Sequence, residues 1–285
     1  MCASAKIKPG IKYIITLIGG AGPDAAIDMQ KKLLCAMRDK LDIKYDQDYY
    51  RIIVDNNTDL PNRDNALLLN GPSPLLAYVE CAKKLEEMGG DILIVSCNTA
   101  HVYFDDIQKS TNMKMINMIE ETAHFVHRKY GYAKKIGLLS TASTLQKGLY
   151  HEAFKKYNIE VISPSLRSQN HVIQAIYGIK AGFISGMRYP DNRSRKKLYN
   201  IYKEISQIKS FAEVKLPKKL LKDAVIELVQ QGTEFVILGC TEIPLVLNDR
   251  DTDVCTLIDP TEITANAAVD YAIGLEKRYM SNKFY

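Results

Sequence analysis

The segment DILIVSCNTAH, residues 91–101, gives the clearest signal of the fold. Its apolar run, residues 92–95, contains no polar residue, which is typical of a strand buried on both faces of a parallel sheet. A helical pattern ending in two glycines precedes it, and Cys97 follows it directly. The same order returns in LKDAVIELVQQGTEFVILGCTEIP, residues 221–244: helix, glycine turn, apolar strand and Cys240. Two similar units are therefore expected.

The rest of the chain extends this repeat outward. Each half opens with an apolar run of strand length, residues 11–18 and 133–140, followed by a turn rich in small residues and a helical pattern. Alternating strands and helices predict an α/β fold of two similar parallel-sheet domains, with the active site in the cleft between them. We predict a first domain of residues 11–120 plus 258–285. The second is residues 121–257, with a basic insertion at about 186–217.

Composition excludes several classes of protein. The 285-residue chain is 46% apolar and 25% charged, which is ordinary for a soluble globular protein. No apolar run approaches the ~20 residues of a membrane span, and the N-terminus lacks a secretory pattern, so we predict a cytoplasmic protein with no membrane partner. The six cysteines are then expected to stay reduced. They contain no C-x-x-C pair, and Cys97 with His101 is a lone C-x-x-x-H, so no metal site is predicted.

The net charge of +5 is concentrated in one segment. Residues 186–222 hold eleven Lys or Arg against three Asp or Glu, interleaved with tyrosines. Such a segment can resemble a nucleic-acid surface. A solvated helical face is the better explanation because it is the usual case for a Lys-rich segment between elements, so we predict no nucleic-acid partner.

Position distinguishes two of the cysteines from the others. In open α/β sheets, ligands bind beyond the carboxyl ends of the strands, which is where Cys97 and Cys240 stand. Cys35 and Cys81 fall in helical patterns, and we interpret them as small apolar core residues. Inverting a stereocentre needs a base on one face of the carbon and an acid on the other. Two matching half-sites with one thiol each fit that chemistry, whereas a nucleophilic thiol enzyme needs one cysteine beside a histidine.

Five motifs carry a resemblance to a known family: GGAGPDAA (19–26), LPNR (60–63), SCNTAH (96–101), STAST (140–144) and GCTEIP (239–244). Together they resemble the aspartate/glutamate racemase family, above all its branch of aspartate and broad-specificity amino-acid racemases. The match covers nearly the whole chain except residues 1–10 and the basic insertion. The resemblance implies an amino-acid substrate, a homodimer, and no pyridoxal phosphate, metal or nucleotide.

The resemblance also implies roles for single residues. Cys97 and Cys240 would be the pair that transfers protons at the α-carbon of aspartate or glutamate. Arg63, with Lys180, would bind the side-chain carboxylate, for which a planar guanidinium is suited. The remaining substrate-binding positions would be Gly20, Asn98, Thr99, Thr141, Thr144 and Thr241.

For two further motif residues we make less specific predictions. His101 stands four residues after Cys97, where it either tunes the thiol or supports the structure, and we favour support. Glu242 follows Thr241 and is expected to orient a neighbour or to pair with a base.

Three alternatives remain open on the sequence alone. Gly20-x-Gly22-x-x-Ala25 fits a dinucleotide-binding turn, but Asp55, at the next strand end, lies 35 positions after Gly20 rather than ~20. A dinucleotide-binding function also explains neither cysteine. A broad-specificity racemase and a non-catalytic amino-acid-binding module are the other two.

Overall fold

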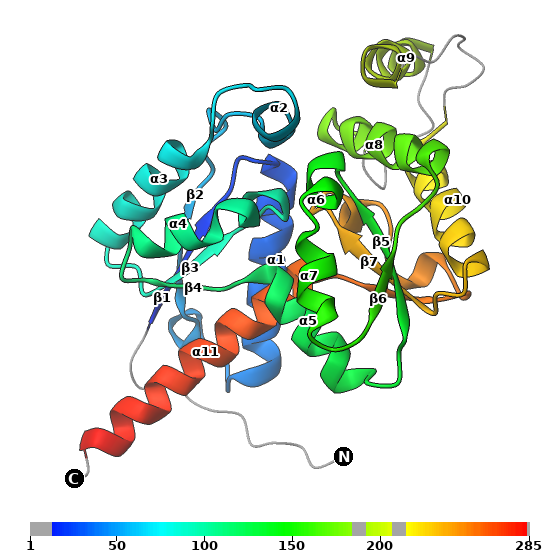
Figure 1. Ribbon diagram of the computed structural model, residues 1–285. Helices are drawn as coiled ribbons and strands as arrows, with labels where there is room; N and C mark the ends of the chain where they lie inside the picture. Colours follow the sequence, from blue (N-terminus) through cyan, green and yellow to red (C-terminus); the bar gives the residue numbers. More distant parts are fainter. Residues whose placement is uncertain (1–12, 184–191, 207–214, 284–285) are drawn as a thin grey trace. The chain divides into compact units, whose positions relative to one another are not determined.

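The two apolar runs that precede the cysteines form strands β3 (Ile92–Val95) and β7 (Phe235–Gly239), and every residue of both is buried. The computed structural model describes residues 13–183, 192–206 and 215–283. The chain divides into unit 1, Met1–Glu121 with Thr261–Tyr285, and unit 2, Thr122–Pro260. Each unit holds one of these strands within a four-stranded parallel sheet (Figure 1). The predicted α/β class with two similar parallel-sheet units is confirmed.

In unit 1 the strand order is β2-β1-β3-β4, with all pairs parallel. This order places β1 and β3 in the middle of the sheet. The strands are β1 (Ile14–Ile18), β2 (Arg51–Asp55), β3 and β4 (Lys114–Met115). The helices are α1 (Pro23–Lys40), α2 (Arg63–Leu68), α3 (Leu75–Glu87), α4 (Phe104–Lys109) and α11 (Pro260–Lys283). The short 3-10 helices are η1 (Asp46–Asp48) and η2 (Thr99–Tyr103).

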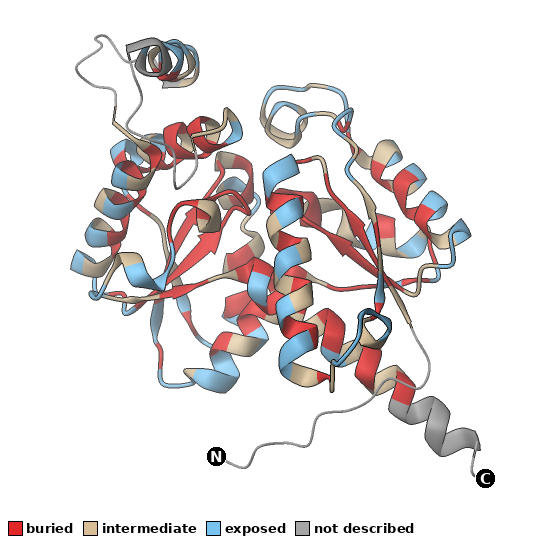
Figure 2. Cartoon of the chain, turned by 180° about the vertical axis from the view of Figure 1, so that it is seen from behind, coloured by how far each residue is buried: buried red, intermediate tan, exposed pale blue. Residues whose placement is uncertain are grey.

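Helices cover both faces of this sheet, which is why β3 is apolar throughout and β1 contains a single polar residue, the buried Thr16. Ile92 and Ile94 pack with α1 and α11 on one face. Leu93 and Val95 pack with α3 and α4 on the other. Side chains of a strand alternate between faces, so a strand buried on both sides shows no polar alternation. Figure 2 shows the central strands in the buried colour.

Unit 2 repeats the arrangement with the order β6-β5-β7-β8, again all parallel. Helices α8 and α10 pack on one face of its sheet, and α9 packs against α8. The strands are β5 (Lys135–Ser140), β6 (Glu160–Ile162), β7 and β8 (Thr256–Ile258). The helices are α5 (Met118–Lys129), which begins in unit 1, α6 (Ala142–Gln146), α7 (Leu149–Lys155), α8 (Leu166–Lys180), α9 (Asn192–Ser206) and α10 (Pro217–Gln230), with the 3-10 helices η4 (Ile243–Leu245) and η5 (Asp249–Asp251).

The predicted basic insertion is described in part. Residues 186–191 and 207–214 lie outside the described residues. Within α9, Lys196 and Lys197 are exposed, whereas Leu198 and Tyr202 are fully buried in the core of unit 2. The helix is therefore amphipathic, with a charged outer face and an apolar inner face. In the described parts of the chain, no helix is long and apolar enough to cross a membrane.

One cysteine differs from its expected position. Cys81 is buried on α3 as predicted, but Cys35 on α1 is exposed. The buried stripe of α1 passes through Leu33, Ala36 and Met37, and Cys35 falls outside it. The prediction of Cys35 as a core residue is wrong because a single position in a helical pattern can lie on either side of the stripe.

The turn between β1 and α1 requires glycine at position 20. Gly20 has a φ of +83°, a left-handed conformation that favours glycine. A Cβ at this position would lie 1.9 Å from the carbonyl oxygen of Asn57, in the loop after β2. The absence of a side chain therefore allows two loops at the carboxyl edge of the sheet to touch.

Gly20→Ala should lower the free energy of unfolding by about 3 kcal/mol or more, because backbone strain and a backbone clash add together. Gly232→Ala is the matched control, since Gly232 has a φ of +86° but a Cβ there would have nothing within 4 Å. It should lose only about 1 kcal/mol. Urea unfolding of both variants measures the difference. Equal losses would contradict the close approach of the two loops.

Candidate active site

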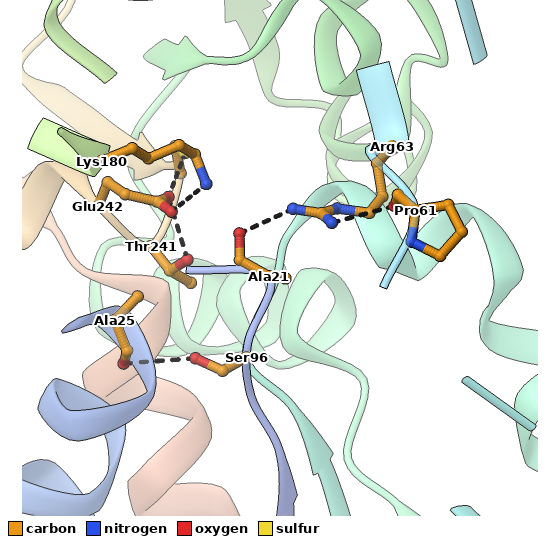
Figure 3. A network of polar contacts seen from close by, with 9 residues as sticks. Ala21, Ala25, Pro61, Arg63, Ser96, Lys180, Thr241 and Glu242 are labelled. Carbon is orange, nitrogen blue, oxygen red and sulfur yellow. Dashed lines mark hydrogen bonds and ion pairs between the residues drawn. The ribbon is translucent and has the colours of Figure 1, made fainter. Parts of the chain in front are cut away.

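Cys97 lies at the carboxyl end of β3, where the sheet fixes its backbone. The N–H of Ser96 donates to the carbonyl of Ile18 at 3.0 Å, so pairing with β1 continues to the residue before Cys97. The Ser96 hydroxyl donates to the carbonyl of Ala25 in α1 at 3.4 Å (Figure 3). Cys97 is 9% exposed and belongs to the core cluster beneath α3. A thiol at this place is nearly buried, but it lies at the edge where α/β sheets bind ligands.

His101 holds the turn that follows Cys97. Its Nε2 accepts from the backbone N–H of Met118 at 3.1 Å, so its Nδ1 carries the proton and donates to the carbonyl of Cys97 at 2.9 Å. Burial lowers the pKa of His101 below its ordinary value, and the ring is neutral. With both nitrogens bound to backbone groups, His101 supports the turn rather than acting on the sulfur.

Asn98 and Thr99 continue the chain from Cys97 into η2. Both are buried, and Asn98 adopts a helical backbone conformation as the residue before η2. Their placement directly after the thiol keeps them among the groups that a ligand at this edge would meet. Gly20, in the neighbouring turn, contributes the close backbone approach described above.

Arg63 is the first residue of α2 and is fixed by backbone carbonyls. Its guanidinium donates to the carbonyl of Ala21 at 2.7 Å and to that of Pro61 at 3.1 Å (Figure 3). Asn62 caps the helix by accepting from the N–H of Asn65 at 3.0 Å. These bonds hold a permanent positive charge next to the turn between β1 and α1, where a carboxylate ligand would be attracted.

In unit 2, Cys240 follows β7 and forms a polar group with Glu242 and Lys180, in which the thiol and the carboxylate are buried and Lys180 is exposed. The thiol donates to Oε2 of Glu242 at 2.8 Å, and Thr241 donates to the same oxygen at 3.4 Å. Lys180, the last residue of α8, forms an ion pair with Oε1 of Glu242 (Figure 3). Cys240 is 6% exposed, and Glu242 is also buried. The expectation that Glu242 pairs with a base is confirmed.

The charges in this group set the protonation of the thiol. Burial raises the pKa of Cys240 well above its ordinary value, the negative charge of Glu242 raises it further, and the ammonium of Lys180 opposes both. Burial alone would raise the pKa of Glu242. Its ion pair with Lys180 and its hydrogen bond from Cys240 outweigh burial and keep its pKa below the ordinary value. The resting group is therefore a thiol, a carboxylate and an ammonium.

Thr141 and Thr144 stand at the carboxyl end of β5 in unit 2. Thr141 caps α6 by accepting from the N–H of Thr144 at 3.3 Å, and its hydroxyl donates to that of Thr144 at 3.2 Å. Both are buried, and the nearby Gln169 donates to the carbonyl of Ser140 at 2.9 Å. These contacts explain the local structure. Their predicted role in binding a substrate stays a prediction.

The predicted residues thus divide between the carboxyl edges of two sheets. Unit 1 contributes Gly20, Arg63, Cys97, Asn98 and Thr99. Unit 2 contributes Thr141, Thr144, Lys180, Cys240 and Thr241. Among the residues that the structure describes, no three His, Cys, Asp or Glu side chains come together as a metal site requires.

One residue in the same cluster as Cys97 was not among the predicted site residues. Tyr78 on α3 is fully buried in the same cluster as Cys97. Its position in the apolar stripe of the helix predicts a core residue. Only the presence of a hydroxyl group in a mainly aliphatic stripe could have indicated a functional role.

Comparison with known proteins finds amino-acid racemases by family model, by sequence and by structure. The family model for Asp/Glu/Hydantoin racemase matches residues 18–188 and 202–268. The solved structure of Picrophilus torridus aspartate racemase is similar with a TM-score of 0.70 and 26% identity, covering 91% of this chain and 94% of that one. The broad specificity amino-acid racemase RacX of Bacillus subtilis is 26% identical over 195 residues, 68% of this chain and 70% of the relative. Glutamate racemase of Aquifex aeolicus is 25% identical over 195 residues, 67% and 63% of the two chains.

Opposite charge changes around Cys240 should change its alkylation in opposite directions. At pH 8, Glu242→Gln should speed the reaction with iodoacetamide because a charge that disfavours the thiolate is gone. Lys180→Met should slow it. The tryptic peptide 223–250 contains Cys240 as its one cysteine, so mass spectrometry follows this site alone.

Lys215→Met is the control, because Lys215 pairs with Asp223 at 2.9 Å in the same unit but does not contact Glu242. It should leave the rate unchanged. Changes of the same sign in the Glu242 and Lys180 variants would contradict the electrostatic account of this thiol.

Proposed function

The chain belongs to the Asp/Glu/hydantoin racemase family, and from that premise we propose that it interconverts L- and D-aspartate by two-base proton transfer between Cys97 and Cys240. The observation that carries this proposal is the repeated position of the thiols. Each follows a fully buried central strand in a unit of strand order 2-1-3-4, at the edge where α/β sheets bind ligands. Racemisation requires two such groups, one for each face of the α-carbon.

In the proposed reaction, one proton is removed from the α-carbon and another is added to it. The thiolate of Cys97 takes the α-proton, and the electron pair left on the α-carbon delocalises into the α-carboxylate. The thiol of Cys240 then gives its proton to the opposite face. The product leaves Cys97 as a thiol and Cys240 as a thiolate, which is the form that acts on the other enantiomer. The resting protonation of Cys240 supports its part as the acid.

We propose that the reaction uses no pyridoxal phosphate, as the family resemblance implies. The carbanion-like state must then be stabilised by donors aimed at the α-carboxylate. Asn98 and Thr99 after one thiol, and Thr241 after the other, are the side chains we assign to this task. Their burial supports the assignment, because hydrogen bonds in a desolvated site stabilise developing charge more strongly than in water.

Arg63 supports an acidic substrate. Its guanidinium is held by two carbonyls, and a planar guanidinium binds a carboxylate through two parallel hydrogen bonds. We assign Arg63 to the side-chain carboxylate of aspartate, with glutamate as the nearest alternative. Lys180 supplies a second positive charge to substrate binding in this proposal.

In D2O, the protein should replace the α-proton of aspartate with deuterium while optical rotation decays to zero. Cys97→Ser and Cys240→Ser should each lower racemisation by about 10²–10⁴-fold, because a hydroxyl is a far weaker acid than a thiol and is not ionised near neutral pH, so it can neither give nor take the proton efficiently. Proton NMR and polarimetry measure the two events. Cys35→Ser is the control, since Cys35 is exposed on α1. Binding of aspartate without exchange would favour a non-catalytic binding module.

Arg63→Met should lower kcat/KM for aspartate by about a hundredfold, the scale of a lost charge-assisted bidentate contact. Its effect on alanine should be much smaller, because alanine has no side-chain carboxylate. Arg51→Met is the control, since Arg51 is exposed at the amino end of β2, the opposite edge of the sheet. Equal losses on both substrates would argue for a broad-specificity racemase in which Arg63 does not select the side chain.

A further inference from the structure

Tyr78 is a polar residue in a place that favours an aliphatic one. It lies on α3 in line with Cys81, Ala82 and Leu85, the buried stripe that packs on the sheet of unit 1. Its side chain is fully buried in the cluster that also contains Cys97. Leucine would fill such a stripe without bringing a hydroxyl into the core, so the function of that hydroxyl needs a physical explanation.

The hydroxyl of Tyr78 is unsatisfied in the resting structure. Among the described residues it has no hydrogen-bond partner at ordinary geometry. A buried polar group without a partner destabilises the fold, and such groups are rare in proteins. Burial raises the pKa of Tyr78 well above its ordinary value, and a negative charge on Cys97 raises it further while Arg63 opposes. Tyr78 is therefore a neutral phenol that can donate a hydrogen bond at any working pH.

Three other groups of unit 1, the side chains of His101, Cys81 and Arg63, do not replace this donor. His101 is neutral and both of its ring nitrogens are bound to backbone. Burial raises the pKa of Cys81, which remains a thiol and accepts from Nδ2 of Asn57 at 3.4 Å, with Asp55 nearby. Arg63 brings a positive charge, and its guanidinium donates to the backbone carbonyls on either side of it.

We propose that Tyr78 is a positioning residue whose hydroxyl donates a hydrogen bond to the sulfur of Cys97 when that sulfur is a thiolate. The donor is held in place before the charge appears, because packing of α3 against the sheet fixes the ring. It gains a strong partner only in the anionic state, since hydrogen bonds to ionised acceptors are roughly twice as strong as neutral ones. The hydroxyl thus favours the thiolate over the thiol. The inference rests on the proposed part of Cys97 in proton transfer.

Tyr78→Phe tests this role by removing one oxygen and keeping the ring. The rate of Cys97 alkylation by iodoacetamide is measured from pH 6 to 10, through the tryptic peptide 85–109, in which Cys97 is the one cysteine. The midpoint of the pH profile should move upward by about one pH unit, the scale of one hydrogen bond to a charged group. The plateau at high pH reports access to the thiol and should be unchanged.

Tyr50→Phe is the matched control. Tyr50 is equally buried in unit 1, but it lies just before β2, at the opposite edge of the sheet, and its hydroxyl donates to Glu276 at 2.9 Å. This variant should lose thermal stability because it leaves a buried carboxylate without its donor, and its alkylation midpoint should not move. Tyr78→Phe should show the reverse pattern, with its melting temperature kept or raised and its midpoint shifted.

An unchanged midpoint in Tyr78→Phe would overturn the inference. So would a raised KM for aspartate with an unchanged midpoint, which would place the hydroxyl on the substrate instead of the sulfur. Alkylation needs no substrate and no turnover. A shifted midpoint in a protein that fails to racemise any amino acid would therefore support the inference and refute the proposed function, so the two failures can be told apart.

Discussion

Both thiols take their position from one constraint, which is that a short parallel strand covered on both faces favours apolar side chains up to its carboxyl end. Strands β3 and β7 are buried along their whole length. Hydrogen bonding with the neighbouring strand continues to Ser96 in unit 1 and to Gly239 in unit 2, one residue before each cysteine. The backbone of each cysteine is therefore set by the sheet. Its loop determines only what surrounds the sulfur.

The two loops surround the two sulfurs with different chemistry. In unit 1 the neighbours of Cys97 are a neutral phenol and a histidine whose ring is bound to backbone, and a fixed guanidinium acts on the same phenol. In unit 2, Cys240 donates to a carboxylate that is itself paired with an ammonium. The units are alike in strand order and unlike in the charge beside the thiol. A repeated fold thus supplies equivalent positions, while the local side chains give each sulfur a different set of neighbours.

The sequence predicted the sheets and the strand-end positions of Cys97 and Cys240 because the signals for both are local. An apolar run, a glycine turn and the residue after the strand all lie within about a dozen positions of one another. Contacts between distant segments were not predictable in this way. His101 accepts from Met118, seventeen residues on, and Glu242 binds Lys180, 62 residues before it. Tyr78 was missed because helical periodicity reports burial, and a buried tyrosine gives no sign of what its hydroxyl faces.

Burial of the thiols raises a further question, since a desolvated sulfur resists becoming the anion that proton abstraction needs. The polar group in unit 2 suggests one way in which this cost could be limited. A thiol, a carboxylate and an ammonium sum to zero charge. If the proton passes from Cys240 to Glu242 over their 2.8 Å hydrogen bond, the group becomes a thiolate, a carboxylic acid and an ammonium, and the sum is still zero. Loss of the same proton to solvent would leave a net negative charge in a buried place. Because charge would be redistributed within the group rather than created, we expect this transfer to cost less than loss of the proton to solvent.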